Sequence, residues 1–215
     1  MNTTKIEWTD KSWNPVTGCA HGCWYCYAKR MFKRFGKSFE PTFYPERLNQ
    51  IDKIKKPCKI FVGSVSDIFA GWTKEGWRKA VIDKICDPKY KHITFQLLTK
   101  QPQNISKIDS FPSNIWIGCT VNDKTESWKI AEMRKVKCKT CFISFEPLLG
   151  SMGKLNLSGI GWIIIGKITG AKKAPFEEWW VDEIWSQALL AKVPTFMKNN
   201  LKSFWHRELI QEFPK

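Results

Sequence analysis

The chain has 215 residues, of which 43% are hydrophobic, and this length and composition exclude an intrinsically disordered protein. They are sufficient for an α/β domain with a packed core, and we expect a single domain over residues 1–215. Eight cysteines are too few for the dense disulfide framework of a small secreted protein.

Basic residues exceed acidic ones by a wide margin. Lys and Arg together number 35 and Asp and Glu 20, which gives a net charge of +15. The excess is also local, because no acid lies between Asp10 and Glu40. A lysine-rich genome would raise the lysine content evenly, whereas a local basic surface attracts polyanions, nucleic acid first. We therefore predict that a nucleic acid or nucleotide contacts the basic residues of this stretch: Lys29, Arg30, Lys33, Arg34 and Lys37.

The sequence shows no segment suited to a membrane. Its first residues, MNTTKIEWTDKSW, lack the basic stretch followed by an apolar stretch that marks a secretory signal. No apolar run approaches the ~20 residues that cross a bilayer. We therefore expect a cytoplasmic protein without a membrane partner.

Four segments predict helices. In the first, Tyr27, Met31 and Phe35 lie at helical spacing with basic residues opposite, and Gly36 should end the helix. Thr73 should cap the second helix, because its hydroxyl suits an N-terminal cap. Two later helices are expected over residues 124–136 and 175–192.

Apolar runs that end in polar residues predict the strands. Continuous apolar strands alternating with helices indicate a parallel sheet that is covered on both faces. A complete eight-unit barrel takes ~250 residues, so this shorter chain predicts an incomplete TIM-like β/α barrel with six or seven parallel strands. The clearest runs lie within residues 59–67, 92–100, 114–123, 141–150, 161–170 and 193–198.

Polar side chains cluster where five of these runs end. Strands must end somewhere, and polar residues suit that position, so any one of them has an ordinary structural explanation. In β/α barrels, however, the carboxyl ends of the strands converge on the active face. Five such ends in register therefore predict a polar cavity mouth. Its residues are Ser64, Ser66 and Asp67, Thr99 and Lys100, Thr120 and Asn122, Ser144 and Glu146, and Lys167 and Thr169.

Three cysteines lie close together in residues 18–26, which read GCAHGCWYC. Cys19, Cys23 and Cys26 form a C-x3-C-x2-C pattern. A structural zinc site takes four protein ligands, usually in C-x2-C pairs, so three cysteines with unequal gaps suggest a metal centre with one open position. Thiolates are also the ligands of iron–sulfur clusters.

This pattern, with Tyr25 directly before the last cysteine, resembles the cluster motif of radical S-adenosylmethionine enzymes. Those enzymes are partial β/α barrels with the motif in the loop after the first strand. Over roughly residues 5–198 the chain also resembles a phage-associated three-cysteine-motif family, described as a domain of unknown function. The segments that carry this resemblance are KIEWTDKSWNPVTGC, FYPERL, IFVGSVSDIF, FQLLTKQP, NIWIGCTVND, FISFEPLLG and PTFMK.

Two features depart from that family. Many members have a longer insert between the first two cysteines, whereas this chain has the short radical-enzyme gap, which favours a cluster. Many members also have a Gly-Gly-Glu-Ser-Gly stretch where this chain has GKITG, so the acid is replaced by Lys167 or lost. The family is often encoded beside a companion protein, which implies assembly with a partner.

The resemblance implies a radical mechanism. Three thiolates would hold a 4Fe–4S cluster and leave one iron free to chelate the amino and carboxylate groups of S-adenosylmethionine. An electron from an electron donor, passed through the cluster, would split the sulfonium. The resulting 5′-deoxyadenosyl radical would take a hydrogen atom from the substrate, here a nucleic acid or nucleotide that is thereby modified.

The resemblance also implies roles for the residues around this cofactor. Tyr25 would neighbour the adenine, and Asp67 is the best partner for the methionyl amino group, because an ammonium favours a carboxylate. Ser64 and Ser66 stand at the same strand end as Asp67. The remaining assignments are Thr120 and Asn122 to the ribose hydroxyls, and Lys100, Glu146 and Lys167 to the substrate side.

Two alternatives remain open. In the first, a zinc-stabilised nucleic-acid module would use His21 or His92 as a fourth ligand, or the C-x2-C pair Cys138 and Cys141. In the second, the chain binds a cluster but catalyses nothing and serves as a scaffold for a partner protein. Separately, three tryptophans near the cysteines could stack on bases, namely Trp8, Trp13 and Trp24.

Overall fold

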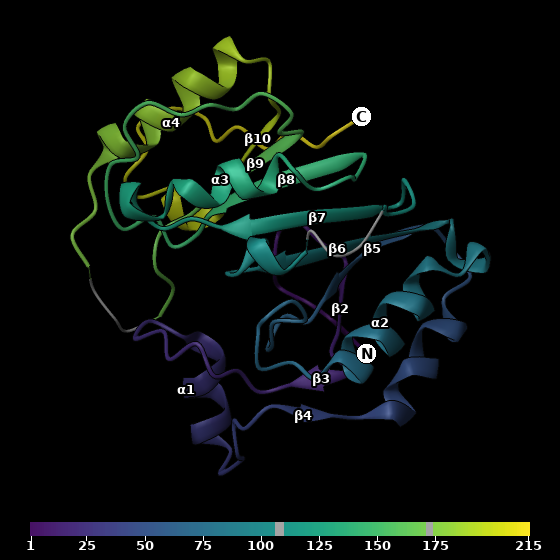
Figure 1. Ribbon diagram of the computed structural model, residues 1–215. Helices are drawn as coiled ribbons and strands as arrows, with labels where there is room; N and C mark the ends of the chain where they lie inside the picture. Colours follow the sequence, from purple (N-terminus) through teal and green to yellow (C-terminus); the bar gives the residue numbers. More distant parts are fainter. Residues whose placement is uncertain (106–109, 171–173) are drawn as a thin grey trace.

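The computed structural model describes residues 1–105, 110–170 and 174–215 (Figure 1). Its α-helices are α1 (Tyr27–Arg34), α2 (Glu75–Cys86), α3 (Trp128–Met133) and α4 (Glu178–Leu190). Its strands are β1 (Asn2–Thr3), β2 (Lys11–Trp13), β3 (Val16–Thr17), β4 (Thr42–Phe43), β5 (Cys58–Val62), β6 (Ile93–Thr99), β7 (Ile115–Thr120), β8 (Thr140–Phe145), β9 (Trp162–Ile165) and β10 (Thr195–Met197).

Within these residues, eight strands form one curled sheet in the order β1-β2-β5-β6-β7-β8-β9-β10. The seven strands from β2 to β10 are parallel, and β1 joins the β2 edge in the antiparallel direction. A short antiparallel pair, β3 and β4, stands apart from this sheet. The predicted incomplete β/α barrel is therefore confirmed, with the larger of the two expected strand numbers.

The helices pack on the outer face of the sheet. Side chains of three helices, such as Val81 of α2, Met133 of α3 and Ile184 of α4, share one buried cluster with alternate residues of the strands. Side chains alternate between the two faces of a strand, so the intervening residues point into the half-barrel. The continuous apolar runs of the sequence reflect this burial on both faces.

The inside of the half-barrel is filled by a second cluster, rich in aromatic side chains. Phe61, Phe142 and Trp162 come from the strands, and Trp8 of the N-terminal segment packs on them with its ring 4.8 Å from that of Phe61. Gly118 is needed here, because a Cβ on it would lie 2.5 Å from the Phe142 ring. The interior is thus closed by rings, which leaves the carboxyl ends of the strands to form a cavity.

The ends of two helices test the predicted signals. Gly36 follows α1 with a φ of 61°, a left-handed conformation that suits glycine, so this predicted end is confirmed. The predicted cap of α2 is wrong: Lys74 is the N-cap residue, and the Thr73 hydroxyl instead donates to the backbone carbonyl of Asp67 at 2.7 Å. Within the described ranges, no helix is long and apolar enough to cross a membrane.

Candidate active site

A cavity of about 630 Å³ opens where the parallel strands end. Asn122 lines a smaller hollow of about 380 Å³, which shares His21, Cys23, Tyr25 and Lys100 with the larger cavity. The strand ends therefore converge as the sequence predicted. The predicted mouth residues that line the larger cavity are Ser64, Ser66, Asp67, Thr99, Lys100, Thr120, Ser144, Glu146, Lys167 and Thr169.

The loop after β2 carries the three cysteines along one wall of this cavity. Asn14 fixes the start of the loop, since its side chain donates to Ser64 Oγ at 3.0 Å and accepts from the backbone N–H of Val65 at 3.3 Å. Gly18 then lets the chain pass close to Glu40, whose carbonyl oxygen would lie 2.2 Å from a Cβ at that position. The close approach and the φ of 82° both require glycine there.

Cys19, Cys23 and Cys26 are free, half-buried thiols that all line the larger cavity. Burial raises the pKa of Cys19 to about 11, and the nearby charges of Asp67, Cys23 and Cys26 act in the same direction. A bound cation reverses this effect, because metal coordination deprotonates a thiol. The donor set therefore fits an iron–sulfur cluster.

The three thiols differ in their contacts and do not lie close together. The Cys26 sulfur accepts from the backbone N–H of Lys29 at 3.3 Å, at the positive N-terminal end of α1. Within the described residues, no three His, Cys, Asp or Glu side chains lie close enough together to hold a metal ion. The three thiols thus share a wall of the cavity without converging on one point.

Asp67 is the buried centre of a hydrogen-bond network at the end of β5. Its Oδ1 accepts from the backbone N–H of Phe69 at 3.0 Å. Its Oδ2 accepts from His21 Nε2 at 2.7 Å, and from Thr99 Oγ1 and the backbone N–H of Lys100, both at 2.9 Å. His21 lies between the first two cysteines in the sequence, so this carboxylate ties the cysteine loop to the ends of β5 and β6.

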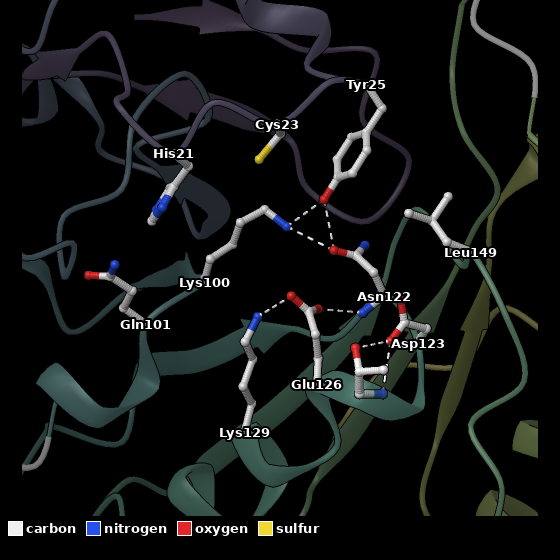
Figure 2. A pocket seen from close by; sticks show the side chains of 11 residues that line it. His21, Cys23, Tyr25, Lys100, Gln101, Asn122, Asp123, Glu126, Lys129 and Leu149 are labelled. Carbon is white, nitrogen blue, oxygen red and sulfur yellow. Dashed lines mark hydrogen bonds and ion pairs between the residues drawn. The ribbon is translucent and has the colours of Figure 1, made fainter.

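Figure 2 shows a second network, in which Tyr25 points from the cysteine loop toward Lys100 and Asn122. The Tyr25 hydroxyl donates to Asn122 Oδ1 at 2.7 Å, and Lys100 Nζ donates to the same hydroxyl at 2.7 Å and to the same amide oxygen at 3.0 Å. Burial lowers the pKa of Lys100 and raises that of Tyr25. The predicted neighbours of the adenine, ribose and substrate therefore contact one another directly.

An ion pair between a half-buried glutamate and a buried lysine supports this network from below (Figure 2). Glu126 accepts from the backbone N–H of Asn122 at 2.8 Å and pairs with Lys129 Nζ at 2.6 Å. The sequence analysis missed both residues, because they precede or begin α3 and a charged pair at that spacing reads as helix surface. Only the short distance in sequence between Glu126 and Asn122 could have drawn attention to them.

Glu146 also has a partner that the sequence analysis missed. Lys198, at the end of β10, pairs with Glu146 and lies 3.6 Å from Glu7 Oε2. Burial disfavours the charge on Lys198, but the two carboxylates outweigh it and raise its pKa. Its stem crosses Gly166, where a Cβ would lie 2.9 Å from the lysine Cδ. Lys198 follows the strand in PTFMK as other mouth residues follow theirs, which was the available signal.

Lys167 and Thr169 line the cavity, and Arg30 contacts Thr169 from α1. Lys167 lines the cavity, with Nζ 3.6 Å from the centre of the Phe204 ring. Arg30 donates to the Thr169 carbonyl at 2.8 Å and so joins α1 to the segment after β9. Of the five predicted nucleic-acid contacts, Arg30 is therefore already engaged within the chain. The other four are exposed on α1 and just beyond it: Lys29, Lys33, Arg34 and Lys37.

The sequence of the chain matches the model of a family described as "Protein of unknown function (DUF5131)" over residues 3–210. The chain belongs to this family. It is also 32% identical over 128 residues to an uncharacterized protein of Methanocaldococcus jannaschii. That match covers 57% of this chain and 48% of the relative, so the chain spans about half the length of this curated relative.

Among solved structures, a spore photoproduct lyase variant with bound AdoMet and dinucleoside spore photoproduct matches this member of the family with a TM-score of 0.57. Sequence identity is 12%, and the match covers 86% of this chain and 62% of that one. A second variant gives a TM-score of 0.56 at 12% identity, over 98% and 71% of the two chains. At such identities the likeness shows the fold alone, a partial TIM-like β/α barrel.

Three of the residues considered for a zinc site lie away from the cysteine loop, namely Cys138, Cys141 and His92. Cys138 and Cys141 form a disulfide at the start of β8, whereas the cysteine loop lies at the carboxyl ends of the strands. His92 precedes β6 and contacts the Ile54 carbonyl at 3.1 Å. A zinc site that combines these residues with the loop does not fit this arrangement, because the two groups lie at opposite ends of parallel strands.

The three tryptophans that could stack on bases have different environments. Trp8 and Trp13 are buried in the two core clusters, so the stacking role predicted for them is wrong. Trp8 packs with the aromatic cluster inside the half-barrel, whereas Trp13, the last residue of β2, belongs to the cluster shared with the helices. Trp24 is 52% exposed and remains available for stacking.

Proposed function

We propose that this chain is a radical S-adenosylmethionine enzyme in which Cys19, Cys23 and Cys26 hold a 4Fe–4S cluster. One observation carries the proposal: the three free thiols of the C-x3-C-x2-C loop line the same cavity as the polar ends of the half-barrel strands. When bound, the cluster supplies the electron that cleaves S-adenosylmethionine reductively, and an external donor must replace that electron. The fold shared with an AdoMet-bound lyase supports this reading.

The residues around the thiols would bind and orient S-adenosylmethionine. Tyr25 is held by Asn122 and Lys100, so its ring is fixed beside the cysteine loop. For Asp67 to accept the methionyl amino group, one of its four present donors must yield. His21 is the donor best able to move, since it belongs to the loop, whereas two of the others are backbone N–H groups.

The substrate class that we propose is a nucleic acid or nucleotide, modified after abstraction of a hydrogen atom. The net charge of +15 and the exposed basic residues of α1 beside the cavity support it. So does the dinucleoside bound by a protein of the same fold. Lys100, Glu146 and Lys167 would face this substrate. We expect the reaction to take place in the cytoplasm, where the loop thiols stay reduced.

The direct test of the proposal is the formation of 5′-deoxyadenosine. The protein is reconstituted with iron and sulfide without oxygen, reduced with dithionite, and incubated with S-adenosylmethionine, and the nucleoside is measured by mass spectrometry. We expect it from the wild type and from Cys58→Ala, a matched control at a half-buried free thiol on β5. We expect none from Cys23→Ala.

The same assay separates the proposal from a non-catalytic scaffold. A scaffold that only holds a cluster would keep its iron and sulfide but release no 5′-deoxyadenosine under any reductant. Equal amounts of the nucleoside from Cys23→Ala and the wild type would contradict the assignment of the cluster ligands.

A further inference from the structure

Large apolar side chains are exposed on and beside α1, next to the cysteine loop. Trp24 is 52% exposed, Tyr27 47%, Met31 40% and Phe35 66%. We call these four residues the α1 face. Tyr27, Met31 and Phe35 follow one another at intervals of four, so they lie along one side of the helix. Isolated exposed apolar residues need no explanation, but a row of them marks a binding surface.

The α1 face is continuous with the cavity. Tyr27 and Met31 line the cavity as well as the helix surface. The Tyr27 hydroxyl donates to the Ser64 carbonyl at 2.6 Å, which fixes the ring at the mouth. Arg30 anchors the neighbouring side of the helix to Thr169 across the same opening. In Figure 1, α1 stands away from the helices that cover the outer face of the sheet.

Positive charge surrounds this surface without any acid in the local sequence. Residues 11–39 contain no Asp or Glu. The exposed cations that accompany the α1 face are Lys29, Lys33, Arg34 and Lys37. Rings interleaved with cations are what proteins use to bind single-stranded nucleic acid, because bases stack on the rings while the cations follow the phosphates.

We propose that the α1 face binds a single-stranded stretch of nucleic acid and leads one nucleotide of it into the cavity. Phe35 and Trp24 would stack on unpaired bases outside the cavity, and Tyr27 on the base at its mouth. A duplex keeps its bases stacked inside, so it cannot offer them to these rings. This inference rests on the proposed function, since it specifies the substrate of the same cavity.

Binding is measured by fluorescence anisotropy with a labelled single-stranded oligonucleotide of mixed sequence, in DNA and RNA forms, and with the matching duplex. We expect Phe35→Ala and Trp24→Ala each to weaken single-strand binding by about 5- to 100-fold. Leu190→Ala is the matched control, because Leu190 is 85% exposed on α4, and it should leave the affinity unchanged. Lys33→Gln should reduce the salt dependence of binding, whereas Phe35→Ala should not.

Three results would overturn the inference. Phe35→Ala could bind the single strand as tightly as Leu190→Ala does. The duplex could also bind the wild type as tightly as the single strand does, and lose as much affinity in the Phe35→Ala and Trp24→Ala variants. Alternatively, the variants could bind nucleic acid as the wild type does and be reduced normally by dithionite, but accept electrons more slowly than the wild type from a reducing protein. That result would identify the α1 face as the docking site of an acidic electron donor. Oligonucleotide binding needs no cluster, so failure of the 5′-deoxyadenosine assay alone would count against the proposed function and not against this surface.

Discussion

The hydrogen-bond network around Asp67 should contribute strongly to the stability of the fold. Asp67→Ala removes a buried carboxylate, 4% exposed, that accepts four hydrogen bonds. The Thr99 hydroxyl can rotate to another acceptor, and His21 can move with its loop. The backbone N–H groups of Phe69 and Lys100 cannot, so the substitution leaves both of them without an acceptor.

The magnitude follows from those two donors. Leaving one buried donor unsatisfied costs about 1–3 kcal/mol, so the pair should cost about 2–6 kcal/mol of the free energy of unfolding. In a protein of this size, each kcal/mol lowers the melting temperature by ~2–4 °C. We therefore expect Asp67→Ala to melt roughly 5–20 °C below the wild type. Asp67→Asn keeps one acceptor oxygen, so its melting temperature should lie between those of the wild type and Asp67→Ala.

The assay is thermal unfolding followed by circular dichroism, on metal-free protein, so that no cofactor contributes to stability. Asp83→Ala is the control, because Asp83 pairs with Lys79 on the exposed side of α2 and should change stability by less than about 1 kcal/mol. An Asp67→Ala protein that melts within the experimental error of the control would refute the reasoning, since the network would then hold nothing together.

Two other predictions concern packing and pH. Gly118→Ala should lower the free energy of unfolding by about 1–3 kcal/mol in urea, because its Cβ meets the Phe142 ring, and Phe142→Leu in the same chain should restore part of it. Equal stability of the glycine and alanine proteins would contradict this. Lys198 has a folded pKa raised above 10.5 by Glu146 and Glu7 despite burial, so its contribution to stability is present below that pH and is lost as pH rises through the folded pKa. In urea unfolding above pH 10, the wild type should therefore lose this contribution to its free energy of unfolding as pH rises, whereas Lys198→Met should not. Superimposable pH profiles of the two proteins would contradict the assignment.

Much of the fold could be predicted because it depends on short, local patterns in the sequence. Apolar runs that end in polar residues predicted the parallel strands, and the shared carboxyl edge of a parallel sheet then brought Ser64, Lys100, Thr120 and Glu146 around one cavity. The end of α1 at Gly36 followed from the conformational freedom of one residue. Each of these inferences needs only a short window of sequence.

What the sequence could not predict depends on contacts between distant segments. Lys198 meets Glu7 from the other end of the chain, and no local pattern announces that a lysine will be buried against two carboxylates. Thr73 was assigned to a helix cap, but its hydroxyl bonds the Asp67 carbonyl instead. Trp8 was a candidate for base stacking, yet its ring packs with the aromatic side chains that fill the inside of the half-barrel.

Asp67 shows the same limit within the site. The sequence placed it correctly at the end of β5, on the wall of the cavity. Its role as partner of the methionyl amino group stays a prediction, because the structure adds that all four of its hydrogen bonds are already made within the chain. A sequence pattern can give the position of a carboxylate but not the number of donors that surround it.

The most direct test of the central claim is electron paramagnetic resonance of the protein after anaerobic reconstitution with iron and sulfide, reduced, before and after addition of S-adenosylmethionine. We predict a 4Fe–4S signal that changes when S-adenosylmethionine is added, that is absent in the Cys19→Ala, Cys23→Ala and Cys26→Ala proteins, and that persists in Cys58→Ala. Bound zinc with no such signal, or a signal that depends on Cys138 and Cys141 instead of the cysteine loop, would contradict it.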